Sequence, residues 1–190
     1  MIDIRSAILQ RRSIRKFQPK PISREILFDL VDMARMHASG NNLQPVRYAV
    51  ISDPEMTGKI FSLTRWAGYL PDFKINHGEE PTAYIVLLRD SRVKKSCDFD
   101  IGAASTNIML TALEHGLGTC CIGSFSREPL NSLLGLEPEL IPELIIALGY
   151  PAHVSRAVPC INGNIRYSQT EDGTFEVPKH SLEDVIMLTK

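Results

Sequence analysis

Two short stretches of the chain are apolar at nearly every position, and they constrain the fold more than any other feature. Residues 83–88 read AYIVLL, and residues 143–148 read ELIIAL. A strand that is apolar on both faces is covered on both faces, so we expect two buried strands in the middle of a sheet. Residues 99–115 are rich in Ala and Leu and almost uncharged, which predicts a long helix buried at the centre and ended by Gly116.

The other elements alternate irregularly between helix and strand. Periodicity and capping residues predict helices over residues 4–11, 24–34, 54–63 and 127–134, strands over 47–52 and 119–122, and an irregular stretch over 66–81. In the tail we expect a hairpin that pairs residues 165–167 with 175–177, followed by a helix from Ser181. This order predicts one domain over residues 1–190, a three-layer mixed α/β or α+β fold.

Composition excludes several classes of function. The 190 residues are 44% hydrophobic and carry a net charge of −1, which gives no long-range field to hold nucleic acid or an anionic membrane. The apolar runs are too short to span a bilayer, and the N-terminus lacks the pattern of a signal peptide. The four cysteines form no C-x-x-C motif, so we expect free thiols in a reducing cytoplasm.

The end of the first helix carries a dense cluster of hydrogen-bond donors: Arg11, Arg12, Ser13 and Arg15. Guanidinium groups form planar, charge-assisted pairs that suit a phosphate. Basic residues are also favoured at the C-terminal end of a helix, so simple capping on a solvated face is the alternative.

A second polar stretch, residues 39–45, reads SGNNLQP. Asn and Gln side chains offer a donor and an acceptor together, which the edge of a heterocyclic ring requires. Because Gly, Asn and Pro also favour turns, an ordinary turn is the alternative. The candidate ligand residues in this loop are Ser39, Gly40, Asn42 and Gln44.

Two further stretches could face a ligand. Ile122, Gly123 and Ser124 follow a buried strand, where backbone N–H groups could approach a planar ring; packing and turn formation are the alternative. Lys179 precedes the expected last helix, whose N-terminus favours an anion, although helix capping explains it equally well.

Signatures of direct side-chain catalysis are missing. The sequence has no H-E-x-x-H, no G-x-S-x-G and no Walker loop, and its five histidines are scattered. We therefore predict no catalytic side chain and no metal site, and we expect a bound cofactor to carry any redox chemistry.

Taken together and in order, these stretches resemble the nitroreductase family. The resemblance rests on I-x-x-R-R-S-x-R from Ile8, on S-x-x-N-x-Q-P from Ser39, on residues 107–125, on LGYPA from Leu148 and on P-K-x-x-L from Pro178. It spans nearly the whole chain. It implies an α+β fold, a three-layer α/β/α sandwich around a mixed, mainly antiparallel sheet, with FMN bound where the subunits of a homodimer meet.

The family resemblance also implies roles for individual residues. Arg11 and Ser13 would hold the FMN phosphate and ribityl chain, and Lys179 would be a second phosphate ligand. Arg15 would lie near the N1/O2 edge of the flavin, and the backbone at Gly123 and Ser124 would face N5. The loop with Ser39 and Asn42 would reach the flavin from the partner subunit.

The implied activity is that of an oxidoreductase in which NADH or NADPH reduces FMN and a nitroaromatic, quinone or related acceptor then takes the electrons, by a ping-pong mechanism. Two alternatives stay open. One is a specialised branch, dehalogenase-like or flavin-fragmenting, whose lid could lie only in residues 66–81. The other is a flavin-binding or sensory module without turnover.

Overall fold

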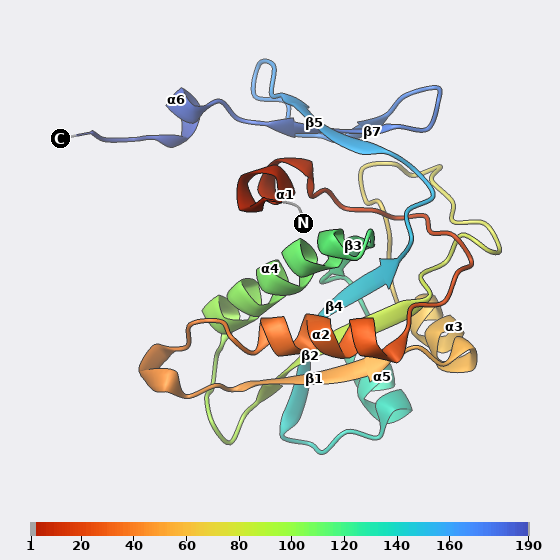
Figure 1. Cartoon of the computed structure of the whole chain (residues 1–190), viewed down its shortest axis with the longest axis vertical. Coiled ribbons are helices and arrows are strands. Elements are labelled where there is room, and N and C mark those ends of the chain that lie inside the picture. Colours follow the sequence, from red (N-terminus) through yellow and green to blue (C-terminus); the bar gives the residue numbers. More distant parts are fainter. Residues whose placement is uncertain (1–2, 190) are drawn as a thin grey trace.

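A four-stranded antiparallel sheet forms the centre of the protein. The structure is a computed structural model, and it describes residues 3–189. The strands lie in the order β1–β2–β4–β3, and each neighbouring pair is antiparallel (Figure 1). Their bounds are β1 (Val46–Ile51), β2 (Ala83–Asp90), β3 (Gly118–Ile122) and β4 (Leu140–Gly149). The two apolar stretches lie in the two central strands, β2 and β4, as the sequence predicts.

Side chains of the central strands alternate between the two faces of the sheet, so the core consists of two clusters. Ile85 and Leu87 of β2 face a cluster built from α2 (Arg24–Ala34) and α4 (Asp98–Glu114). Tyr84 and Val86 face the other side, where α3 (Pro54–Ser62) and α5 (Arg127–Leu134) pack. Because successive strand residues point to opposite faces, this pattern requires helices on both sides. The predicted α+β sandwich with a mainly antiparallel sheet is confirmed.

Helix α4 is less buried than its composition predicts. Ile101, Ala104, Ile108 and Ala112 lie in the core, but Phe99 is 93% exposed. The expectation of a helix buried at the centre is therefore wrong for a single chain. The helix belongs to an outer layer, so only one of its sides meets the sheet and α2.

The C-terminal region also differs from the prediction. A second sheet has the order β5–β7–β6, with β5 (Ser155–Pro159), β6 (Ser168–Gln169) and β7 (Phe175–Lys179). The predicted hairpin partner at residues 165–167 is wrong, because the paired residues are Ser168 and Gln169. The parallel partner β5 was not predicted, since parallel pairing is not visible in local sequence. Helix α6 (Leu182–Val185) is only four residues long.

The N-terminal segment connects the two sheets. After α1 (Ile4–Gln10) the chain runs extended across the ends of β3 and β4 and beneath the small sheet (Figure 1). Ile14 N donates to Thr119 O at 2.8 Å. A Cβ atom on Gly118 would lie 2.8 Å from Ile14, and one on Gly149 would lie 2.7 Å from Phe17, so both positions need glycine. In the described part of the chain no helix is long and apolar enough to cross a membrane.

Candidate functional site

The basic side chains in the segment that follows α1 have different hydrogen-bond partners. The Arg11 guanidinium reaches the Met109 sulfur on α4, with Nη1 3.8 Å from Sδ. The Arg12 guanidinium turns back and donates to the Arg11 carbonyl oxygen. Ser13 pairs with Thr119 at the edge of β3, which fixes the backbone between the two basic positions.

Arg15 lies at a small cavity of about 190 Å³. The cavity brings Arg15 together with Ile122, Gly123 and Ser124, three candidate residues more than a hundred positions away in the sequence. No atom lies within 4 Å of the position that a Cβ on Gly123 would take, so the backbone there is open to a ligand. The other lining residues are Arg65, Trp66, Ala67, Cys120, Cys121 and Tyr167.

A larger cavity, about 630 Å³, lies elsewhere, between the segment at Pro19 and Pro21, the start of α3 and residues 77–82. Its lining includes none of the candidate cofactor-binding residues. Because it offers few donors to a charged ligand, we assign the candidate site to the smaller cavity.

The loop of residues 39–44 forms a strained turn. It contains the 3₁₀ helix η1 (Gly40–Asn42), and Asn42 and Gln44 have φ of 54° and 50°. Left-handed backbone is costly for residues other than glycine, and Asn tolerates it best. Such a conformation persists only where surrounding contacts hold it.

A buried polar network holds this loop against the first turn of α4. The Ser39 hydroxyl donates to Asp100 Oδ1 and accepts from Gln44 N at 3.0 Å. Lys94 Nζ lies 2.9 Å from Asp100 Oδ2, and His37 Nε2 lies 3.7 Å from Oδ1. Burial pushes the pKa of Asp100 upward, but the hydrogen bonds from Ser39 and Lys94 outweigh it and hold the pKa below its usual value.

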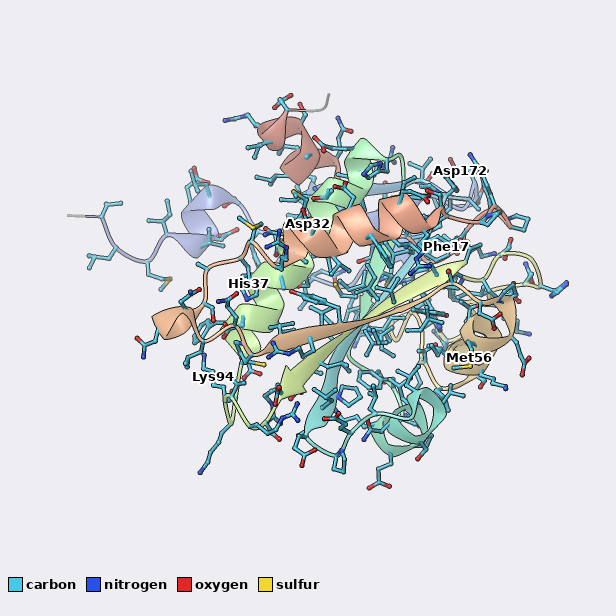
Figure 2. All side chains as sticks on the ribbon, turned by 60° about the horizontal axis from the view of Figure 1, so that its bottom comes forward. Phe17, Asp32, His37, Met56, Lys94 and Asp172 are labelled. Atoms are coloured by element: carbon cyan, nitrogen blue, oxygen red, sulfur yellow. The ribbon has the colours of Figure 1, made fainter. Side chains whose placement is uncertain are left out.

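The two groups of candidate residues are separate within one chain. Ser39 is attached at Asp100, whereas Arg11 touches Met109, nine residues and about 13 Å further along α4. In Figure 2, Phe17 lies near the N-terminal end of α2 and His37 lies beyond its C-terminal end. No residue of the 39–44 loop lines the cavity at Arg15.

Lys179 is exposed at the end of β7. Its backbone carbonyl accepts from Cys160 N at 2.8 Å, so the strand pairing fixes its position. Phe175, four residues earlier on the same strand, packs against Arg15. The small sheet therefore connects Lys179 to the cavity, although its side chain does not line the cavity itself.

Sequence reasoning missed several residues of this region. Asp100 lies in the first turn of α4, where a carboxylate usually only stabilises the helix end, yet its side chain is 2% exposed and binds the loop. His37, His153 and Tyr167 gave no signal, because their partners are distant in sequence. The only signal of the network in the sequence is the carboxylate of Asp100, which lies at the start of an almost uncharged helix and close in sequence to Lys94.

The network predicts the effect of removing its charge. Asp100→Asn should lower the free energy of unfolding by about 1.5–3 kcal/mol at pH 7, because charge-assisted hydrogen bonds to a buried carboxylate are lost. The depressed pKa means that this stabilisation is present above about pH 4 and is lost as the pH falls through the folded-state value. Chemical denaturation at several pH values measures it. Asp98→Asn, at an exposed position two residues earlier, is the control and should change little. Equal effects of the two substitutions would contradict the role of the network.

Comparisons with known proteins identify the family of the chain. The family model described as the nitroreductase family matches residues 8–73 and 78–150. A Methanothermobacter thermautotrophicus protein, described as an NADH dehydrogenase/NAD(P)H nitroreductase, is 32% identical over 158 residues, covering 80% of this chain and 78% of that protein. A Bacillus subtilis protein described as FMN reductase (NADPH) is 26% identical over 170 residues, covering 80% of this chain and 67% of that protein.

Solved structures share the fold. An Exiguobacterium sibiricum protein, described as a nitroreductase and crystallised in complex with FMN, aligns with a TM-score of 0.68 at 22% identity, covering 80% of this chain and 90% of that chain. The family match covers more than half of the 190 residues and contains both central strands and, in full, three of the five stretches on which the resemblance rests. The chain belongs to the nitroreductase family.

Proposed function

We propose that the protein is an FMN-dependent oxidoreductase that uses NADH or NADPH to reduce a small-molecule acceptor. The observation that carries the proposal is Arg15, a residue that is only 9% exposed, lines a cavity and has a buried Nη1 atom without a hydrogen-bond partner. A buried cation without a carboxylate requires an anionic or strongly polar ligand. The related proteins described as binding FMN or using NAD(P)H identify the class of ligand.

The residues present fit FMN. Arg11 and Ser13 would bind the phosphate and the ribityl chain, with Lys179 as a further phosphate ligand. Arg15 would face the N1/O2 edge of the ring system, and the backbone at Gly123 and Ser124, next to Ile122, would face N5. Arg12 donates within its own segment, so we assign it no direct contact.

The remaining ligands come from a second copy of the chain. Ser39, Gly40, Asn42 and Gln44 lie too far from the Arg15 cavity to complete one site within a chain, so we propose a homodimer whose two sites each combine both groups. A stable dimer needs a large apolar surface. The C-terminal arm offers one, since α6 and the residues after it extend away from the body (Figure 1). Its exposed apolar residues are Leu182, Val185, Ile186, Met187 and Leu188.

When bound, FMN supplies a ring that accepts a hydride from NAD(P)H and passes two electrons to a nitroaromatic, quinone or related acceptor. The chain's own residues bind and orient the ring and shape the face on which both substrates are placed in turn. No side chain acts as acid, base or nucleophile. The Cys120 thiol lies at the cavity, but burial raises its pKa and keeps it protonated at neutral pH. The free thiols suit a reducing cytoplasm.

Affinity for FMN tests the assignment of the phosphate site. Arg11→Ala should weaken FMN binding about ten- to a hundredfold, the loss expected for one charge-assisted hydrogen bond. Arg12→Ala, the control, should change it little, because that guanidinium is already bonded to the backbone. Quenching of flavin fluorescence measures both. Small, equal losses would indicate a solvated basic turn, and no binding by the unaltered protein would refute the cofactor assignment.

Steady-state kinetics test the order of events. If both substrates use the same face in turn, initial-rate plots against NADH concentration at several acceptor concentrations should be parallel lines. Cys120→Ala should leave the rate largely unchanged, because the thiol only packs at the cavity. Intersecting lines would show a ternary complex and contradict the proposed mechanism. Loss of turnover in Cys120→Ala with FMN still bound would contradict the absence of a catalytic side chain.

A further inference from the structure

Arg15 is enclosed by two aromatic rings, one from β7 and one from the residue just before β6. Its Cζ atom lies 4.5 Å from the centre of the Tyr167 ring and 5.0 Å from that of Phe175. Phe175 is fully buried on β7, and Tyr167 is half-buried at the cavity. The faces of aromatic rings attract a cation without neutralising it. The positive charge therefore remains available to a ligand.

The backbone of Arg15 is fixed as well. Arg15 N donates to His153 Nε2 at 2.8 Å, and His153 Nδ1 lies 3.0 Å from the Val154 carbonyl oxygen. Since a carbonyl can only accept, Nδ1 carries the proton and Nε2 is free to accept from Arg15. The His153 ring also contacts Phe175, with 4.7 Å between ring centres. Backbone and guanidinium are thus held by the same group of side chains.

The irregular segment of residues 66–81 supports this enclosure from outside. Tyr69 N donates to the Tyr167 hydroxyl at 3.3 Å, and the two rings lie 5.0 Å apart. Phe73 meets Phe175 edge to face at 5.4 Å. Tyr69 therefore restrains the Tyr167 ring and Phe73 restrains the Phe175 ring, so neither ring turns easily away from Arg15.

Arg15 has no competing charge partner. No ion pair joins its guanidinium to a carboxylate anywhere in residues 3–189, and the carboxylate of Glu79 pairs with Lys16, the residue after Arg15. An acidic partner would cancel the field that the cation exerts in the cavity. Enclosure by rings keeps the guanidinium in place and leaves that field intact.

We propose that Tyr167 and Phe175 are positioning residues that hold the Arg15 guanidinium at the flavin and thereby raise the reduction potential of bound FMN. The proposal rests on the proposed function and deepens it. A fixed cation beside the N1/O2 edge stabilises the reduced, anionic ring more than the oxidised one. Both aromatic residues lie beyond residue 150, where the match to the family model ends, so this enclosure is a feature that the match does not supply.

The test compares Tyr167→Leu with the unaltered protein at saturating FMN. The midpoint potential of the bound flavin is measured by equilibration with a redox dye, and the affinity for oxidised FMN by fluorescence quenching. We expect reduced FMN to lose about tenfold more affinity than oxidised FMN, which is a shift of about 30 mV to more negative potential for a two-electron couple. Tyr167→Phe keeps the ring and should retain the original potential.

Two controls separate positioning from general disturbance. Phe28→Leu removes an exposed ring that lies 4.7 Å from Arg24 on α2, and it should change neither the potential nor the affinity. In an Arg15→Gln background, Tyr167→Leu should produce no further shift, because the ring acts through the guanidinium. Should Tyr167→Leu fold poorly, Tyr167→Met fills the space with a flexible side chain and carries the same expectation.

The outcomes are distinct. An unchanged potential in Tyr167→Leu with FMN bound, or an equal shift when Arg15 is Gln, would overturn the positioning role and leave the proposed function standing. Failure of the unaltered protein to bind FMN would instead refute the proposed function itself. A shift in Tyr167→Leu that is absent in Tyr167→Phe, in Phe28→Leu and in the Arg15→Gln background would establish the role.

Discussion

The extended segment after α1 lies directly on the backbone of two glycines, and the candidate site depends on that contact. Ile14 covers Gly118 at the start of β3, and Phe17 covers Gly149 at the end of β4, each at a distance that leaves no room for a Cβ atom. Close packing of this kind transmits small changes, because interiors have few voids to absorb them. Between these two contacts Arg15 has little freedom to move. The glycines thus fix the position of a charge that neither of them touches.

Charge burial is handled differently in the two halves of the candidate site. At the 39–44 loop a carboxylate, an ammonium group and a hydroxyl form a local network, and Asp100 is satisfied within the chain. At the cavity, Arg15 is surrounded by aromatic rings and keeps an unsatisfied nitrogen. The first arrangement fixes a loop, whereas the second leaves an electrostatic field for a ligand. A carboxylate whose hydrogen bonds are satisfied within the chain stabilises the loop, whereas a guanidinium with an unpaired nitrogen is available to bind a ligand.

The sequence predicts the parts of the fold that depend on local pattern. The two apolar stretches predict the central strands, and the helices predicted over residues 24–34 and 127–134 have the bounds of α2 and α5. The sequence does not predict the parts of the fold that depend on partners distant in the chain. Tyr167 lies 152 positions from Arg15, and the pairing of β5 with β7 is parallel. Neither contact therefore produces a periodic pattern in the sequence. The exposed side of α4 was predicted to be buried, because composition does not show which side of a helix faces the core.

In the proposed homodimer, each flavin site takes Arg11 from one chain and the 39–44 loop from its partner. The direct test is to co-express two differently tagged chains, one with Arg11→Glu and one with Asn42→Glu, and to isolate the heterodimer. Each variant alone should bind no FMN. In the heterodimer one site carries both changes and the other carries neither, so the account predicts one FMN per heterodimer with near-normal affinity. A heterodimer that binds no FMN, while the unaltered dimer binds two, would show that both groups belong to the same chain and would contradict the account.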